Sequence, residues 1–201
     1  MNVALLSTIL ALLAVVAAVL IRRGVGLNLF RRKKEIPGLF IGLDGSGKTT
    51  FLYMLRDGEV YDTLSTIGFN IEEIDIAKNT FMCIFDVGGQ DKIRPLWRHY
   101  YFRASFLAFF IDGSKPERFG DAKEELLRLD NEAEIGSNVP RVILCNKKDL
   151  PDYLSSEEVS RALGLADLTR HWDIIETSGT KKEHVEEFLD WIRRTFQLLS
   201  T

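Results

Sequence analysis

The sequence has few of the residues that are typical of a disulfide-stabilised or zinc-binding protein. Its 201 residues include two cysteines and three histidines, and the histidines show no metal-ligand spacing. Cys83 and Cys145 lie in the apolar runs FMCIF and VILCN, which predict buried strands. Two isolated thiols of this kind are typical of core residues in a reducing compartment. We therefore expect neither a disulfide nor a cysteine-bound metal.

Acidic residues are absent from the first 34 positions. The only charged side chains there are Arg22, Arg23, Arg31, Arg32, Lys33 and Lys34. The rest of the chain then has 20 basic residues against 29 acidic ones, a net charge of −9. A folded domain with that charge is not expected to bind nucleic acid electrostatically.

Long uncharged apolar runs are also scarce, and the one exception spans residues 3–21. As a helix rising about 1.5 Å per residue, it would measure close to about 30 Å, enough to cross a bilayer. Basic residues follow the run, whereas a signal peptide carries them in front, and the positive-inside rule places this flank in the cytosol. We expect a transmembrane anchor over 1–21, a basic juxtamembrane linker over 22–35 and a folded domain over 36–201. A cleaved signal peptide and an interfacial segment are the alternatives.

The stretch GLDGSGKT, residues 42–49, fits the phosphate-binding pattern G-x-x-x-x-G-K-[ST] in full. It follows LFIGL, which predicts a strand, and leads into KTTFLYML, which predicts a helix. Glycines let backbone N–H groups point at a phosphate, and the helix N-terminus adds its dipole. Lys48 should reach the β- and γ-phosphates. The candidate phosphate-binding residues are Gly42, Asp44, Gly45, Ser46, Gly47, Lys48, Thr49 and Thr50.

The stretch NKKD, residues 146–149, indicates that the bound base is guanine. It follows the apolar run RVILC, so it should lie at the carboxyl edge of the same sheet. The Asp149 carboxylate can accept hydrogen bonds from guanine N1–H and N2–H, a pair that adenine does not offer. We expect Lys147 to stack its aliphatic stem on the base and Asn146 to brace the phosphate-binding loop.

Two further segments predict contacts around the γ-phosphate. In TFMCIFDVGGQDK, residues 80–92, a strand ends at Asp86, and Gly88 and Gly89 allow the backbone to approach the phosphate. Gln90 would orient an attacking water, and Thr66 in STIGFN would close onto the metal and the γ-phosphate. The catalytic candidates are Gln90, Lys48 and Thr66, and the Mg²⁺ candidates are Thr49, Thr66 and Asp86.

With these motifs assembled, residues 28–199 resemble the Arf and Arf-like branch of the Ras-type small GTPases. The segments that carry the resemblance are GLDGSGKTT, STIGFNIEEI, FDVGGQDKIRPLWRHYY, CNKKDLP and FLDWI. The resemblance implies an α/β fold, a six-stranded, mostly parallel sheet with helices on both faces. The sequence agrees, with apolar strands at 38–43, 80–86, 106–112, 140–145 and 173–177 that alternate with helical patterns.

Other local signals predict how these elements begin, turn and pack. We expect the first strand to start after Pro37, which cannot donate to a ladder, and a hairpin to turn at Lys78-Asn79. SSEE, residues 155–158, predicts a helix-opening capping box. The acidic run KEELLRLDNEAE, residues 123–134, predicts a solvated helix face. The terminal segment predicts a helix packed on the sheet through Val185, Phe188, Leu189, Ile192, Phe196 and Leu199.

The resemblance also implies functional regions and partners. Switch I would lie around residues 66–70 and switch II around 86–101, with effector contacts at Phe69, Phe85 and Tyr100; half-buried packing is the alternative for these rings. Ser178 and Gly179 would form the third guanine-contacting segment, with the Gly179 N–H toward the guanine carbonyl. The expected ligands are GTP, GDP and Mg²⁺, and the expected partners are a GTPase-activating protein, an exchange factor and effectors. We expect a monomer.

Hydrolysis is expected to be slow, because no arginine in the sequence is recognisable as completing the site in cis. The N-terminus departs from the family, which usually offers a glycine after the initiator methionine for myristoylation, whereas this chain has Asn2. We therefore expect permanent attachment to a lipid bilayer, with the domain in the cytosol at an endomembrane, and a role in membrane traffic or organelle organisation. The alternative is a non-switching, GTP-binding platform that resembles the β subunit of the signal-recognition-particle receptor.

Overall fold

The structure, a computed structural model, describes residues 33–198. Nearly all of these residues belong to one compact unit, residues 35–201. The expected membrane anchor over 1–21 lies outside the described residues, as does nearly all of the expected linker over 22–35. Within the part that is described, no helix is long and apolar enough to cross a membrane.

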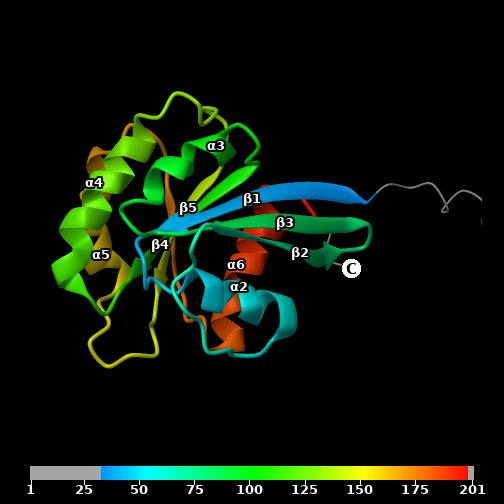
Figure 1. Ribbon diagram of the computed structural model, residues 1–201, viewed down its shortest axis with the longest axis horizontal. Helices are drawn as coiled ribbons and strands as arrows, with labels where there is room; N and C mark the ends of the chain where they lie inside the picture. Colours follow the sequence, from blue (N-terminus) through cyan, green and yellow to red (C-terminus); the bar gives the residue numbers. More distant parts are fainter. Residues whose placement is uncertain (1–32, 199–201) are drawn as a thin grey trace, which may run out of the picture. The chain divides into compact units, whose positions relative to one another are not determined.

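One six-stranded sheet organises the domain (Figure 1). Its strands are β1 (Lys34–Gly42), β2 (Phe69–Ala77), β3 (Thr80–Val87), β4 (Phe106–Asp112), β5 (Arg141–Asn146) and β6 (Asp173–Glu176). Their order in space is β2-β3-β1-β4-β5-β6. The β2–β3 pair is antiparallel, whereas the β1–β4, β4–β5 and β5–β6 pairs are parallel. The expected six-stranded, mostly parallel sheet is thus confirmed.

Helices cover both faces of this sheet (Figure 1). They are α2 (Lys48–Asp57), α3 (Arg98–Tyr101), α4 (Phe119–Asp130), α5 (Ser156–Leu163) and α6 (Lys182–Thr195), with short 3-10 turns η1 (Arg94–Leu96), η2 (Pro116–Arg118) and η3 (Leu165–Asp167). One apolar cluster joins α3, α4 and α5 to the sheet. A second cluster joins α2 and α6 to it. This two-sided burial explains why β4 and β5 are buried along their whole length.

Strand β1 begins earlier than expected, because it includes Pro37. Pairing of β1 with β4 starts only at Gly38, which lies opposite Phe106. On the β4 side, Pro37 therefore needs no N–H, and its carbonyl oxygen accepts a hydrogen bond of 2.8 Å from the Ser105 N–H. The prediction that the strand starts after the proline was wrong for this reason.

The β2–β3 hairpin turns where it was predicted to turn. Ala77 lies opposite Thr80, so Lys78 and Asn79 form the two-residue connection. Asn79 has φ of 64°, a left-handed conformation that asparagine tolerates better than most side chains. The capping box is also confirmed, because Ser155 and Glu158 exchange hydrogen bonds between side chain and backbone at the start of α5.

The acidic run on α4 is not a uniformly solvated face. Glu125 is buried and its Oε1 lies 3.2 Å from Arg94 and 2.8 Å from Arg128. Asp130 is also buried and accepts hydrogen bonds from the Thr169 N–H, the Thr169 hydroxyl and the Arg170 N–H. Two of the carboxylates expected in water are therefore structural. Apart from Arg128, which lies on the same helix, their partners are 31 to 40 positions away in the sequence.

Four fully buried aromatic rings join the strand and helix that flank the phosphate-binding motif to the terminal helix. Phe40 lies on β1, Phe51 on α2, Phe110 on β4 and Phe188 on α6. In five pairs of these rings the centroids are 4.9 to 6.2 Å apart, in tilted or edge-to-face arrangements. Tight packing of this kind fixes the direction of α2 relative to β1.

Replacing Phe188 with alanine should lower the free energy of unfolding by about 3–5 kcal/mol, because it leaves a cavity between α6 and the sheet. The measurement is urea unfolding of the purified chain followed by circular dichroism. The control is Phe102→Ala, since the Phe102 side chain is 76% exposed and its loss should change stability by less than about 0.5 kcal/mol. Equal stability losses in the two variants would contradict the packing described here.

Candidate functional site

Three of the predicted motifs meet at the carboxyl edge of the sheet. GLDGSGKT follows β1, the DVGGQ segment spans the end of β3 and NKKD spans the end of β5. A cavity of about 270 Å³ lies among them. Its lining residues are Asp44, Gly45, Gly47, Lys48, Thr49, Thr50, Thr63, Leu64, Ser65, Thr66, Gly88, Gly89, Gln90 and Lys147. Ligands of open α/β sheets bind at this edge.

The loop before α2 needs glycine at two positions, Gly45 and Gly47. Gly45 has φ of 70° and Gly47 has φ of 87°, values that side chains with a Cβ rarely adopt. A Cβ at Gly47 would also overlap the Asn146 side-chain amide. That amide donates a 2.9 Å hydrogen bond to the carbonyl oxygen of Ser46, so the end of β5 braces the loop across 100 residues of sequence.

Lys48 is buried at the floor of the cavity. Its Nζ donates hydrogen bonds to the carbonyl oxygens of Gly42, at 2.9 Å, and Leu43, at 3.0 Å. Burial lowers the pKa of Lys48 to about 8, although the nearby Asp86 carboxylate acts in the opposite direction. A buried ammonium held mainly by carbonyl oxygens has unused capacity to attract an anion.

Thr49, Thr66 and Asp86 converge from three different segments. The Thr49 hydroxyl donates to Asp86 Oδ2 at 2.6 Å and lies 2.8 Å from the Thr66 hydroxyl. Burial raises the pKa of Asp86, and Lys48 lowers it to a smaller extent. Asp86 Oδ1 is buried without a hydrogen bond of good geometry to the described residues, although Asn70 lies opposite it on β2.

This cluster fits a hard divalent cation. It offers two hydroxyl oxygens and a buried carboxylate with an oxygen to spare, and Mg²⁺ prefers oxygen ligands while keeping several waters. The described residues contain no group of three or more histidine, cysteine, aspartate or glutamate side chains that could hold a metal by themselves. The donor set therefore suits a cation that is shared with phosphate and water.

The segment after β3 lies directly against the phosphate-binding loop. A Cβ at Gly89 would overlap the backbone of Gly42, Leu43 and Asp44, so only glycine fits there. The neighbouring Gly88 accepts a 2.9 Å hydrogen bond from the buried indole N–H of Trp97 and donates its N–H to Gly68. This close approach brings Gln90 to the wall of the cavity.

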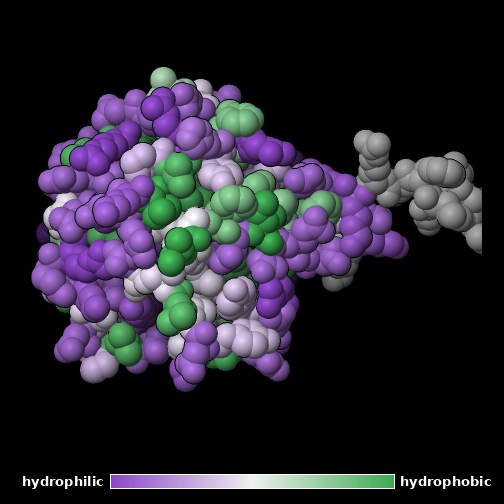
Figure 2. All heavy atoms as spheres, in the orientation of Figure 1, coloured by the Kyte–Doolittle hydropathy of each residue, from purple (hydrophilic) through white to green (hydrophobic). Residues whose placement is uncertain are grey.

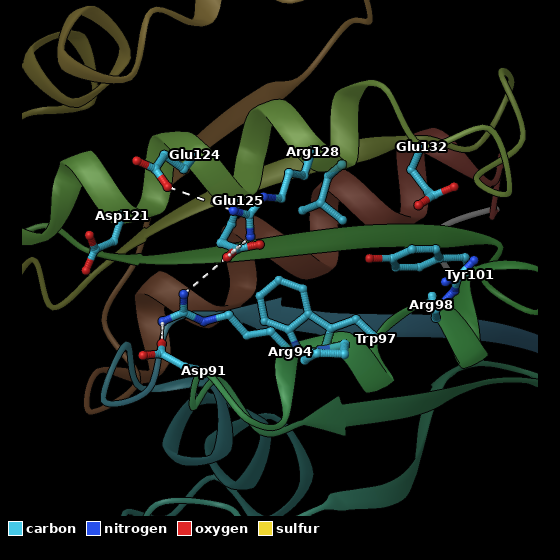
Figure 3. Close-up of a pocket in the computed structure, with 12 residues that line it drawn as sticks. Asp91, Arg94, Trp97, Arg98, Tyr101, Asp121, Glu124, Glu125, Arg128 and Glu132 are labelled. Carbon is cyan, nitrogen blue, oxygen red and sulfur yellow. Dashed lines mark hydrogen bonds and ion pairs between the residues drawn. The ribbon is translucent and has the colours of Figure 1, made fainter.

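Arg94 fixes the same segment from its other side. Its Nε donates to the Gly89 carbonyl oxygen at 2.9 Å, and its guanidinium forms ion pairs with Asp91 and with Glu125 on α4 (Figure 3). A larger cavity of about 530 Å³ lies beside these side chains, between α4 and the η1–α3 segment. None of the predicted site residues lines this larger cavity. The smaller cavity is the candidate site, because predicted phosphate-binding and catalytic residues line it.

The candidate base-binding residues lie together, at the ends of β5 and β6. The Ser178 hydroxyl donates to Asp149 Oδ1 at 2.6 Å, and the Gly179 N–H donates to Asn146 Oδ1 at 3.0 Å. A guanine carbonyl oxygen that accepts a hydrogen bond from the Gly179 N–H therefore has to compete for it with Asn146 Oδ1. Of these residues, Lys147 alone lines the 270 Å³ cavity; it has φ of 71°, and its Nζ lies 2.7 Å from Asp112.

Sequence reasoning missed three side chains that hold this site. Asp112 ends β4 and pairs with Lys147, Arg94 holds Gly89, and Arg118 on η2 donates to the carbonyl oxygen and the carboxylate of Asp44. Arg94 lies within FDVGGQDKIRPLWRHYY, but the sequence assigns it no role, and Asp112 and Arg118 belong to none of the motifs. Arg118 and Asp44 are 74 positions apart, so only the fold brings them together.

The three aromatic side chains expected to contact effectors differ in exposure. Phe69 is 51% exposed, whereas Phe85 is buried, with its ring 5.5 Å from that of Tyr100 and below the Arg103 guanidinium. At Phe85 the structure therefore agrees with the alternative, packing, and not with an exposed effector contact. Figure 2 shows apolar side chains gathered on one face of the molecule. The large exposed apolar residues between residues 60 and 71 are Val60, Tyr61, Leu64, Ile67, Phe69 and Ile71.

Comparison with known proteins agrees with this geometry. The model of the ADP-ribosylation factor (Arf) family matches residues 24–196. The solved structure of the Arl6 (BBS3) small GTPase from Trypanosoma brucei, with bound nucleotide analogue GppNp, is 27% identical, with a TM-score of 0.74 over 83% of this chain and 100% of that chain. The structure of the mammalian SRP receptor is 20% identical, with a TM-score of 0.71 over 79% of this chain and 99% of that chain, a likeness of fold alone. The chain belongs to the Arf family of small GTPases.

Proposed function

We propose that this protein is a membrane-anchored Arf-like switch that binds GTP and GDP with Mg²⁺, hydrolyses GTP slowly and recruits effectors in its GTP state. Arf-family membership implies guanine nucleotide binding and GTP hydrolase activity in general. The observation that supports the switch is the convergence of Thr49, Thr66 and Asp86 beside Gln90. It joins the segment expected to sense the γ-phosphate to the segment expected to hold the metal.

The proposed reaction is attack of water on the γ-phosphorus. A bond forms from the water oxygen to phosphorus, the bond to the β–γ bridging oxygen breaks, and the products are GDP and inorganic phosphate. Gln90 orients the water, and Lys48 neutralises charge that develops on the β- and γ-oxygens. Thr49, Thr66 and Asp86 are the residues that would hold Mg²⁺. When bound, Mg²⁺ supplies charge neutralisation at the phosphate oxygens.

Slow turnover is expected because the arginines near the cavity are bonded to other residues of the domain. No arginine lines the 270 Å³ cavity within residues 33–198. Arg94 is bonded to Gly89, Asp91 and Glu125, and Arg118 is bonded to Asp44. An arginine supplied by an activating protein typically accelerates such reactions by about 10³–10⁵. We therefore propose a GTPase-activating protein and an exchange factor as partners of a monomeric switch.

The effector surface that we propose adjoins the cavity. Leu64 and Thr66 lie in one segment, Leu64 is 93% exposed, and the neighbouring Ile67 is 86% exposed. Phe69 continues this apolar surface onto β2, where its ring lies 5.6 Å from that of Tyr100. Exposed apolar surface next to a ligand-sensing segment suits a partner that docks in one nucleotide state.

The proposed location is an endomembrane, with the domain in the cytosol. The uncharged run over residues 3–21 and the six basic residues that follow it support a single membrane span with this orientation. A permanent anchor would leave nucleotide state to control which partners bind, and not where the protein resides. This arrangement suits a role in membrane traffic or organelle organisation.

The second candidate function is a non-switching platform subunit that keeps GTP as a structural ligand. The apolar run before a GTPase domain favours it, because a constitutive receptor subunit needs the same attachment. In that case Gln90 would have no role in turnover. Hydrolysis, nucleotide release and the effect of a Gln90 variant therefore distinguish the platform from the switch.

Gln90→Leu should slow phosphate release from GTP at least about tenfold, because leucine cannot orient the attacking water. Affinity for GDP should be unchanged. The measurement is single-turnover phosphate release by the full-length chain in mild detergent, with bound nucleotide quantified in parallel. The control is Gln197→Leu, which also exchanges glutamine for leucine and lies beyond α6. Stable, uncleaved GTP on both the unchanged chain and the Gln90 variant would support the platform.

Asp149→Asn should weaken GDP binding by about a hundredfold, because an amide cannot accept both guanine N–H groups. The same variant should gain affinity for xanthosine diphosphate, since its amide N–H₂ can donate to the xanthine carbonyl that replaces the guanine amino group. Titration with fluorescent GDP and XDP measures both effects. Asp152→Asn, three positions away and exposed, is the control. A loss of GDP binding without a gain for XDP would count against direct base contact by Asp149.

The full-length chain should float with liposomes in a density gradient and stay with them in alkaline carbonate. A chain that lacks residues 1–21 should remain at the bottom of the gradient. A third chain, in which six of the alanine and leucine residues within 3–21 are replaced by lysine or aspartate, controls for length. If the truncated chain floats equally well and stays bound in carbonate, the proposed anchor is wrong.

A further inference from the structure

Arg118 donates two hydrogen bonds to one residue of the phosphate-binding loop, Asp44. Its Nη1 donates to the carbonyl oxygen of Asp44 at 2.5 Å, and its Nη2 donates to Asp44 Oδ1 at 2.6 Å. Arg118 ends the η2 turn, immediately before Phe119, the first residue of α4, whose side chain is buried in the core. The guanidinium is thus fixed by the core on one side and by the loop on the other.

The contact with the Asp44 carbonyl sets the direction of a peptide group. In a trans peptide, the carbonyl and the following N–H point in opposite directions. Because Arg118 draws the Asp44 carbonyl oxygen toward η2, the N–H of Gly45 points the other way. Gly45 lines the cavity, and an N–H that points away from Arg118 can donate to a phosphate there.

The contact with the carboxylate controls a negative charge at the phosphate end of the cavity. Asp44 lines the same cavity as Thr66 and Gln90, and its backbone N–H lies directly against Gly89. The carboxylate is ionised at neutral pH, and the hydrogen bond from Arg118 lowers the pKa of Asp44 further. An unrestrained carboxylate at this position would repel a γ-phosphate, which a diphosphate lacks.

We propose that Arg118 is a positioning residue that sets the preference of this site for guanosine triphosphate over diphosphate, by holding the Asp44 carboxylate away from the γ-phosphate. The proposal rests on the proposed function, because it assumes a guanine nucleotide in the 270 Å³ cavity. Through the Asp44 carbonyl, Arg118 supports binding of both nucleotides. Through the Asp44 carboxylate, it supports binding of the triphosphate alone.

The Arg118–Asp44 pair contributes little to the stability of the fold. The two side chains are 29% and 42% exposed, and ion pairs that solvent reaches contribute little to stability. A change in nucleotide preference can therefore be separated from loss of folding. Arg193, on α6, supplies a matched control, because its side chain is 32% exposed and pairs with Asp190 at 2.7 Å, away from the site.

The experiment measures the affinities of the full-length chain, in mild detergent with Mg²⁺, for GDP and for the non-hydrolysable analogue GppNp. The variants are Arg118→Ala, Arg118→Lys, Asp44→Ala, the double variant Arg118→Ala with Asp44→Ala, and the control Arg193→Ala. The melting temperature of each nucleotide-free variant is measured beside its affinities. Single-turnover hydrolysis at saturating GTP is measured for Arg118→Ala.

Arg118→Ala should lower the ratio of GppNp affinity to GDP affinity about tenfold, the size expected for one charge-assisted hydrogen bond. The double variant should recover most of the ratio, because the charge that Arg118 restrains is gone, while both affinities stay below those of the unchanged chain. Arg118→Lys should keep most of the ratio, since lysine retains the positive charge. Melting temperatures and the Arg193→Ala control should stay near the values of the unchanged chain.

An equal loss of affinity for both nucleotides in Arg118→Ala, with no recovery of the ratio in the double variant, would overturn the proposal and leave a structural role. Unchanged affinities with slower hydrolysis would also overturn it, because Arg118 would then act on the chemical step. If the unchanged chain binds neither nucleotide, the proposed function itself fails. If the unchanged chain binds both nucleotides and Arg118→Ala leaves the ratio of their affinities unchanged, only the proposed role of Arg118 is refuted.

Discussion

The burial of the Lys48 ammonium is the constraint on which the rest of the site depends. A charge removed from water must be compensated, and here the compensation comes from the carbonyl oxygens of Gly42 and Leu43 and from the nearby Asp86 carboxylate. Those carbonyls can reach Nζ only because the loop turns back on itself through the left-handed conformations of Gly45 and Gly47. The glycine pattern, the lysine and Asp86 near the end of β3 together compensate the charge of one buried ammonium.

Helix α4 and the η2 turn before it hold both loops that border the cavity. Arg118, from η2, bonds to Asp44 in the phosphate-binding loop. Glu125, from α4, bonds to Arg94, which in turn holds the Gly89 carbonyl beside Gln90. The two loops are thus attached to one rigid element by charge-assisted hydrogen bonds, which are roughly twice as strong as neutral ones. The positions of both loops therefore depend on the same helix and the turn before it.

Much of the fold and the motifs of the site were predictable, because their signals are local. Apolar runs of strand length, the Lys78-Asn79 turn, the Ser155 capping box and GLDGSGKT each require only a few neighbouring residues. What could not be predicted depends on distant pairs. The acidic run on α4 was predicted to be solvated because Arg94, one of the two arginines that pair with Glu125, lies 31 positions away. Pro37 was predicted to precede the strand because the register with β4 was unknown. The role of Arg118 could not be predicted for the same reason, since its partner Asp44 lies on a loop 74 positions earlier.

The brace from Asn146 to the Ser46 carbonyl has a consequence for how the molecule is made. It closes 100 residues of chain, and the bond from Asn146 to the Gly179 N–H adds a partner still later in the sequence. Because contacts between distant residues form slowly and synthesis proceeds from the N-terminus, the phosphate-binding loop emerges from the ribosome long before the residues that hold it in shape. The cavity is then among the last parts of the domain to be completed. Nucleotide can therefore bind the completed cavity only after the chain as far as Gly179 has been synthesised.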